Sequence, residues 1–277
     1  MYHYKNLKEI KDAETTACLN LAFSDYALPI RLTEEQLQAL FSASGVDKEL
    51  SYGAFLEGKM VGFILNSCSS YQNRKVVFDV GTGVVPEHRG RKIFTNLFAF
   101  AEQELLRHGV ERYYLEVLQQ NDKAISAYKK QGFFTVREFY VLKSPSVSEK
   151  EDAEVEYEEM KTFDFSKVRL RNYVQPSYEH STEVLKWNPE LYAAVYRKTE
   201  NITALCMISK GDGRILQMAY DDICELKRVV QGILARFGTI TVKNIDGRNT
   251  EVLEMFYSMG FTEAAKQFEM AKDLKAL

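Results

Sequence analysis

The spacing of hydrophobic residues along the first half of the chain alternates between a helical and a strand-like period, which predicts an α/β domain. Apolar residues recur with helical period over residues 12–23 and 33–41 and predict two helices. Thr33 is suited to cap the second helix, because its side-chain oxygen can accept a hydrogen bond from a first-turn N–H group and two glutamates follow it.

Runs with strand character come next. Residues 50–56 and 59–65 flank the pair Glu57-Gly58 and predict a β-hairpin across a short turn. Residues 75–85 predict the following strand. The sequence Gly81-Thr82-Gly83 lies inside that strand and indicates a β-bulge or a close backbone approach, because glycine otherwise weakens a strand.

A basic turn and a helix follow this strand. The strand ends at Pro86, and the turn carries His88, Arg89 and Arg91. Apolar residues then recur with helical period at Ile93, Phe94, Leu97, Phe98, Ala101, Leu105 and Leu106. A turn that leads into a helix presents unpaired N–H groups and the positive end of the helix dipole. The segment therefore predicts an anion site, with phosphate as the expected guest.

The same order of strand and helix recurs further along the chain. Residues 112–118 are rich in strand-forming residues, and residues 122–131 predict a short helix that ends at Gly132. Ala124 and Tyr128 share one face of this helix, because residues four apart are neighbours on its surface.

Together, the basic turn and the pattern Asn121-x-x-Ala124-x-x-x-Tyr128-x-x-x-Gly132-Phe133 resemble the coenzyme site of the GNAT (GCN5-related N-acetyltransferase) family. In that family a loop Arg/Gln-x-x-Gly-x-Gly/Ala wraps the coenzyme pyrophosphate, chiefly through backbone N–H groups; here Lys92 and Phe94 fill two of its small positions. The resemblance covers residues 1–143 and implies acetyl-CoA as cosubstrate and no metal. It assigns coenzyme binding to Val84, Val85, Arg89, Gly90, Arg91, Lys92, Ile93, Phe94, Asn121, Ala124 and Tyr128.

The resemblance also suggests the catalytic groups. It places Tyr128 near the coenzyme sulfur, where a tyrosine with a pKa of about 10 can protonate a thiolate whose thiol has a pKa of about 8.5. Asp79, on the strand before the loop, is the candidate base that deprotonates the amine, directly or through water. Asp79 and Thr82 are also candidate substrate contacts, as is Tyr26, which falls where the family places its acceptor loop.

Simpler roles stay open for these residues. The basic turn could be an ordinary strand-to-helix turn, and Asn121 could cap the helix that follows it. Tyr128 could be a core tyrosine, and Asp79 could bind substrate or solvent. Cys68 has no histidine near it in the sequence, which favours a buried or edge thiol over the nucleophile of an acyl-enzyme.

Composition narrows the functional class. With 277 residues, 45% of them hydrophobic, the chain is long for one domain and suited to two. A formal net charge of −3 gives no reason to expect nucleic acid as a partner. The four cysteines form no CxxC pair, which favours reduced thiols over zinc ligands. No apolar run reaches membrane-spanning length and no basic leader opens the chain, so we expect a cytoplasmic protein without a membrane partner.

The second half repeats the first in a degenerate form. Asn249-x-x-Val252-x-x-x-Phe256-x-x-x-Gly260-Phe261 matches the pattern around Tyr128 at an offset of 128 residues, from 121 to 249. Residues 194–208 correspond to the hairpin, and residues 216–220 to the strand before the basic turn. Asp221-Asp222 then stands where the basic turn would be, and Phe256 replaces Tyr128. We do not expect this copy to bind coenzyme A in this way or to protonate a thiolate.

These observations predict a tandem of two α/β GNAT-like domains, each a mixed sheet flanked by helices. Residues 1–143 would carry the acetyl-CoA site, residues 144–156 a polar linker, and residues 157–277 a degenerate domain that closes the acceptor cleft or forms the contact of a homodimer. The expected activity is that of an acyltransferase, which moves acetyl from acetyl-CoA to a primary amine of a small-molecule or peptide acceptor by direct attack. The alternatives are a noncatalytic acyl-CoA sensor or scaffold, and an acyltransferase that uses longer acyl chains.

Overall fold

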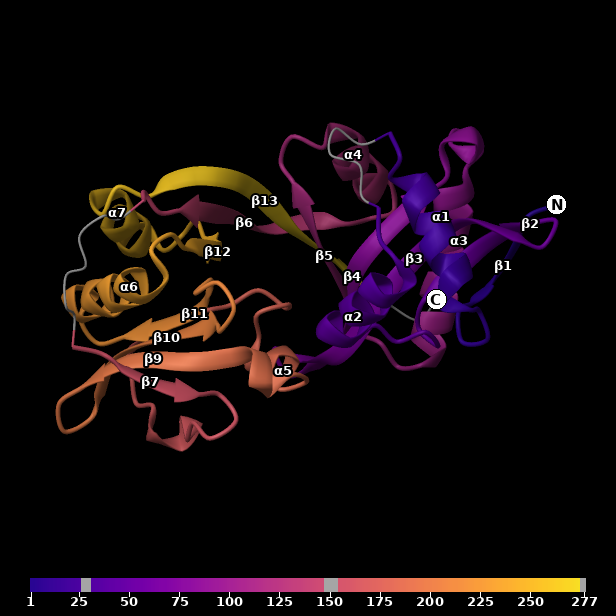
Figure 1. The fold of residues 1–277 in the computed structure, drawn as a ribbon. Helices are drawn as coiled ribbons and strands as arrows, with labels where there is room; N and C mark the ends of the chain where they lie inside the picture. Colours follow the sequence, from indigo (N-terminus) through magenta and orange to yellow (C-terminus); the bar gives the residue numbers. More distant parts are fainter. Residues whose placement is uncertain (26–30, 147–153, 275–277) are drawn as a thin grey trace. The chain divides into compact units, whose positions relative to one another are not determined.

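The computed structural model describes residues 1–25, 31–146 and 154–274, which form two compact units (Figure 1). The first unit consists of Met1–Glu116, Lys123–Phe134 and Met270–Leu277, and the second of Val117–Asp122 and Thr135–Glu269. The end of the chain therefore belongs to the first unit. The predicted linker, residues 144–156, falls within the range of the second unit, and its residues 147–153 lie outside the described part of the chain.

The first unit is a mixed sheet with helices on both faces. Its strand order is β1-β2-β3-β4-β5, with antiparallel neighbours up to β4 and a parallel pair of β4 with β5. Its elements are β1 (His3–Asn6), α1 (Asp12–Ala22), α2 (Glu34–Ser44), β2 (Tyr52–Leu56), β3 (Lys59–Tyr71), β4 (Arg74–Val84), the 3₁₀ turn η1 (Pro86–His88), α3 (Ile93–Arg107), β5 (Arg112–Leu118) and α4 (Asp122–Lys130). The end of β13 (Thr262–Asp273) completes the unit, where Asp273 contacts Arg74 and Arg112.

Side chains that alternate along the central strands fill the cores on the two faces of this sheet. Phe63 and Leu65 belong to a buried cluster with residues of α1 and α2. On the side of α3, the ring of Phe98 packs against Tyr113 of β5 and against Phe133, with ring centroids 5.5 and 5.4 Å apart. The sheet thus holds β4, the strand that leads to the basic turn, between two packed layers.

The predicted elements of the first half are confirmed. Thr33 caps α2 in a capping box with Gln36, and the hairpin turns at Glu57 and Gly58, both with positive φ. The bulge also forms: Leu65 pairs with Gly81 and Asn66 pairs with Asp79, so Val80 is the extra residue of β4. The sequence underestimated β3, which continues to Tyr71 because its outer part pairs with the beginning of β4.

The second unit is also a mixed sheet, with the strand order β6-β12-β11-β10-β9-β7 and β8 paired to β11. Helices α6 and α7 cover one face, and the other face packs against Met160, Phe163 and Leu185. Its elements are β6 (Phe134–Lys143), β7 (Glu156–Glu159), η2 (Phe165–Lys167), β8 (Asn172–Val174), α5 (Thr182–Leu185), η3 (Pro189–Leu191), β9 (Tyr192–Lys198), β10 (Ile202–Ser209), β11 (Ile215–Tyr220), α6 (Ile223–Phe237), β12 (Thr241–Asp246), α7 (Thr250–Ser258) and the first part of β13. No helix in the described ranges is long and apolar enough to cross a membrane.

The pairing registers of the strands show which residues of the two units are equivalent. In the second unit Met207 pairs with Gln217 and Ile208 with Ile215, which is the same bulge that Leu65, Asn66, Gly81 and Asp79 form in the first. The strands end alike, since Val84 pairs with Gly62 and Tyr220 pairs with Ala204. By this register, Ile215 is the counterpart of Asp79 and Ile208 is the counterpart of Asn66.

Candidate active site

The candidate site of the first unit begins where two parallel strands separate. Within the described residues, the ladder between β4 and β5 ends at the pair Phe78 and Tyr114. The bulge at Val80 follows at once, and a bulge bends its strand and increases the twist. Beyond it, residues 82–84 of β4 pair with β3 on one side and with no other described strand on the opposite side. Such an open strand edge is suited to an extended ligand that carries amide groups.

Three predicted residues meet at this edge. Asp79 lies on β4 directly before the bulge, and its Oδ2 accepts hydrogen bonds from the Thr82 hydroxyl at 2.7 Å and from the Tyr128 hydroxyl at 3.0 Å. Its other oxygen, Oδ1, is buried and accepts no hydrogen bond from any residue that the structure describes. The arrangement therefore leaves one buried carboxylate oxygen with unused capacity to accept a hydrogen bond.

Burial raises the pKa of the Asp79 carboxyl to about 6, because the ionised form loses its hydration. The hydroxyls of Thr82 and Tyr128 and the N–H group of Gly81 oppose this shift, since they stabilise the carboxylate. A carboxyl group with a pKa near neutrality can both take up and release a proton under physiological conditions. This shift is compatible with the role of Asp79 as a base, which stays a prediction.

Aromatic packing fixes the ring of Tyr128. Phe94 and Phe133 contact it edge-to-face, each with ring centroids 5.5 Å away. Phe94 occupies a position that the resemblance assigns to glycine or alanine, and here its side chain packs against the candidate acid. The large residue thereby orients the Tyr128 hydroxyl toward Asp79.

The basic turn offers backbone N–H groups at the start of α3. Gly90 and Lys92 have φ values of 75° and 58°, in the left-handed region that glycine adopts most easily. Lys92 is the N-cap residue of α3 and makes no side-chain cap hydrogen bond within the described chain. The N–H groups of the first helical turn therefore face outward beside the exposed side chains of Arg91 and Lys92, as an anion site requires.

Arg89 takes a different position from the one expected of a phosphate ligand. Its guanidinium group binds both carboxylate oxygens of Asp25, at 2.5 and 3.0 Å, and donates to the carbonyls of Ala22 and Val84. These contacts fasten the basic turn to the end of α1. The phosphate role of Arg89 stays a prediction. The backbone N–H groups at the start of α3 and the exposed side chain of Arg91 are more accessible to an anion.

The other predicted site residues lie in the core or near the start of α4, apart from Tyr26. Val85 and Ile93 are buried in the core, so that only their backbone groups can reach a ligand. Asn121 precedes α4, where its N–H group donates to the Leu118 carbonyl, and Ala124 is half-buried in the first turn of that helix. Tyr26 lies outside the described residues.

Sequence reasoning missed a buried polar group behind Asp79. The Tyr113 hydroxyl donates to the Asn66 side chain, and Asn66 pairs with Asp79 across β3 and β4. Burial raises the pKa of Tyr113 well above its usual value, and the nearby Asp79 charge adds to this effect. Asn66 could have been found as the polar residue that interrupts the apolar run of β3.

The second unit has apolar residues at the positions of three of these polar residues. The counterparts of Asp79, Asn66 and Tyr128 are Ile215, Ile208 and Phe256, all of them fully buried. Burying a polar group without partners destabilises a fold, and an apolar group removes that penalty. The second unit therefore packs apolar side chains at all three positions, so this type of sheet can form without the polar residues.

Comparison with known proteins agrees with this geometry. Residues 15–133 match the profile of the family described as Acetyltransferase (GNAT) family. A GCN5-related N-acetyltransferase from Sphaerobacter thermophilus has a similar structure, with a TM-score of 0.64 and 13% identity, and the match covers 99% of this chain and 96% of that one. A GCN5-related N-acetyltransferase from Anabaena variabilis is 12% identical with a TM-score of 0.61, covering 99% and 73% of the two chains.

A tandem GNAT protein from the clavulanic acid biosynthesis pathway matches over both full lengths, with 10% identity and a TM-score of 0.58. No curated protein matches the sequence significantly. At these identities the structures show a shared fold, and the match over residues 15–133 adds the family. The first half of the chain therefore carries a domain that matches the GNAT acetyltransferase family, and the whole chain has a fold similar to that of a tandem GNAT protein.

Proposed function

We propose that the first unit is an N-acetyltransferase that moves acetyl from acetyl-CoA to a primary amine. The observation that carries the proposal is the hydrogen bond of the Tyr128 hydroxyl to Asp79, beside the open edge of β4 and the N–H groups of α3. An extended arm with amide groups suits the edge, and a pyrophosphate suits the helix start. The amine acceptor is a small molecule or a peptide.

The reaction follows from the two hydrogen-bonded groups. The amine reaches the site as ammonium, loses one proton to solvent, and attacks the thioester carbonyl to give a tetrahedral oxyanion. Asp79 takes the second N–H proton, directly or through water, and collapse of the oxyanion breaks the C–S bond. Tyr128 gives its proton to the leaving thiolate and recovers one from Asp79 through their 3.0 Å hydrogen bond. The products are an amide and coenzyme A, and both side chains return to their first state.

A noncatalytic acyl-CoA sensor is the second candidate, and one observation favours it. Lys92 and Phe94 replace the small residues of the coenzyme loop, and Phe94 packs against the candidate acid instead of leaving room for a ligand. Both candidates predict coenzyme binding, so turnover separates them. A homodimer and a cytoplasmic location stay expectations from the sequence.

Calorimetric titration with acetyl-CoA, followed by release of free thiol in the presence of an amine panel, tests the proposal. We expect binding in the micromolar range and thiol release with at least one amine. An Arg91→Glu variant should bind at least about tenfold more weakly, because a like charge then faces the phosphates. Arg107→Glu, the same substitution in the last turn of α3, is the matched control, because this side chain is 70% exposed and lies at the opposite end of the helix from the anion site. Binding without thiol release for every amine would support the sensor, and no binding would reject both.

The turnover number should also depend on pH in a way that Asp79 sets. A general base must be ionised, so protonation of Asp79 should add a further factor of about ten per pH unit to the fall of kcat below a pKa of about 6. Above that pH, kcat should rise only with the loss of the ammonium proton. The measurement is thiol release against pH with the acceptor saturating at every pH. An acid limb near pH 4 would mean that Asp79 is solvated like an ordinary carboxyl, and would contradict its role.

A further inference from the structure

The second unit has the same separation of parallel strands, but its slot is occupied by its own chain. β11 and β12 pair at Ile215 and Val242, and beyond that point β8 lies antiparallel to β11, with Val174 opposite Met218 and Asn172 opposite Tyr220. By the shared register, residues 218–220 are the counterparts of residues 82–84, the open edge of β4. The position that is an open edge in the first unit therefore carries a peptide in the second.

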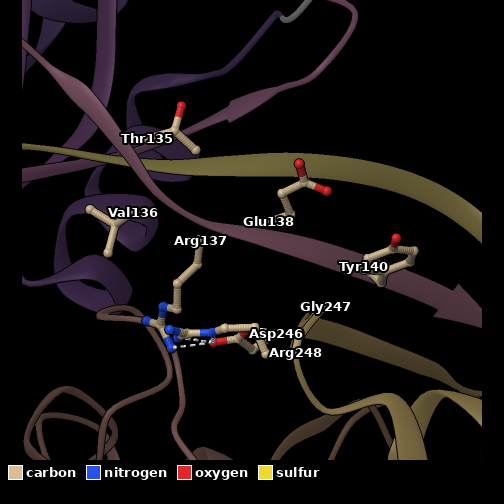
Figure 2. Close-up of a pocket in the computed structure, with 8 residues that line it drawn as sticks. All are labelled: Thr135, Val136, Arg137, Glu138, Tyr140, Asp246, Gly247 and Arg248. Carbon is tan, nitrogen blue, oxygen red and sulfur yellow. Dashed lines mark hydrogen bonds and ion pairs between the residues drawn. The ribbon is translucent and has the colours of Figure 1, made fainter.

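Buried charges hold the chain that follows β8. Arg137 of β6 donates to the carbonyls of Gln175 and Pro176, at 3.0 and 3.3 Å, and binds both oxygens of Glu269 at 2.7 Å. The side chains of Arg137 and Glu269 are each only 2% exposed. Figure 2 shows Arg137 reaching from β6 toward Asp246, beside Arg248, in a pocket of about 290 Å³. Both guanidinium groups of this pocket contact carboxylates.

Further side chains fix the same segment. Asn244 donates from Nδ2 to the Ser177 hydroxyl at 3.0 Å, and Gln217 donates from Nε2 to the His180 carbonyl at 2.5 Å. Gln217 is the counterpart of Gly81, so a side chain that reaches the segment replaces a residue without one. Tyr178 is fully buried within the unit. Residues 172–180, hereafter the internal segment, are thus bound along their length.

The N-terminus of α6 also has a hydrogen-bond partner from the chain itself. Two residues connect β11 to α6, and the second of them, Asp222, caps the helix by accepting a hydrogen bond from the N–H group of Cys224 at 2.7 Å. A carboxylate of the protein therefore occupies the anion position at this helix N-terminus. The equivalent helix of the first unit, α3, has no such carboxylate cap.

From these contacts we infer that the second unit binds an extended peptide in the slot between β11 and β12, and that its ligand is the internal segment of the same chain. The backbone of β8 takes the place of an extended arm and Asp222 takes the place of a phosphate. Two consequences follow: the chain binds no more than one acyl-CoA, and the second unit keeps its slot filled whether or not coenzyme is present. The inference about the second unit stands apart from the proposed function, which concerns the first.

Hydrogen exchange of the full-length protein, with and without acetyl-CoA, tests this inference. Amides of residues 172–174 and 218–220 should exchange at least about a thousandfold more slowly than an unfolded chain, because they open only when the unit unfolds, and acetyl-CoA should leave them unchanged. Amides of residues 82–84 should exchange faster in the free protein and slow on addition of acetyl-CoA. Fast exchange over residues 172–174, or a change there on adding acetyl-CoA, would overturn the inference.

The two proposals fail in different ways in this experiment. If acetyl-CoA has no effect on residues 82–84 while residues 172–174 stay protected, the coenzyme site of the first unit is wrong and the filled slot stands. Calorimetry adds a second readout: we expect one acetyl-CoA per chain, and two per chain would contradict a filled slot.

Discussion

Replacing Asp79 with Asn should lower kcat by about 10²- to 10⁴-fold, the range in which positioned acids and bases contribute. Asn keeps the size of the side chain, and its carbonyl oxygen can still accept from Thr82 and Tyr128, so the geometry should survive. It cannot take up the amine proton. Single-turnover thiol release measures the loss directly, and calorimetry checks that acetyl-CoA still binds as tightly as to the wild type.

The same variant should be more stable than the wild type at pH 7. Folding raises the pKa of Asp79 from 3.8 to about 6, so the protonated form is favoured in the folded chain. The stabilisation that Asp79 gives is complete below its unfolded pKa and is lost as the pH rises through about 6. Asn carries no charge at any pH. The gain in melting temperature should therefore appear above pH 6 and vanish near pH 4, which separates a catalytic loss from misfolding.

Tyr128→Phe decides whether the two groups act in series. If Asp79 returns the proton that Tyr128 gives away, removal of either breaks the same path, and the double variant should be no slower than Asp79→Asn alone. If the double variant instead lowered kcat by the product of the two single effects, Asp79 and Tyr128 would have independent roles. Thr82→Val is the matched control, because it removes the other hydroxyl on Asp79 Oδ2 and should only move the acid limb to higher pH.

The sequence predicted local features of this site better than its long-range contacts. The bulge beside Gly81, the cap at Thr33 and the short helix that carries Tyr128 depend on neighbouring residues, and all three form. The repeat with Phe256 in place of Tyr128 was visible as well, because it preserves spacing.

Contacts between distant residues could not be read in this way. Arg89 binds Asp25, 64 residues away, and basic residues in a turn give no sign of which acid they will meet. Asn66 and Tyr113 are 47 residues apart, and only the fold shows that they meet behind Asp79. The three residues of β8 are too few to show the alternation of apolar and polar residues that predicts a strand. Nothing in the sequence therefore indicated that residues 172–180 fill a slot.

Arg137→Gln should lower the free energy of unfolding of the second unit by about 3–5 kcal/mol, the usual effect of breaking a buried ion pair. The variant leaves Glu269 buried without its cation, and the carbonyls of Gln175 and Pro176 lose their donors. Trp187 is the one tryptophan of the sequence and lies in the second unit, so its fluorescence during urea denaturation reports this unit. Exchange over residues 172–180 should accelerate in parallel.

Lys198→Gln is the matched control, because Lys198 pairs with Glu156 in the same unit, both side chains are nearly half exposed at 48% and 46%, and neither has a described contact with the internal segment. Exposed ion pairs contribute about 0–1 kcal/mol, so the urea midpoint should hardly move. The double variant Arg137→Met/Glu269→Met removes both charges at once and should recover part of the stability. If exchange over residues 172–180 stays fast in that variant, the donors of Arg137 hold the segment in its slot. If exchange returns to the wild-type rate, β8 is held by its pairing with β11 alone.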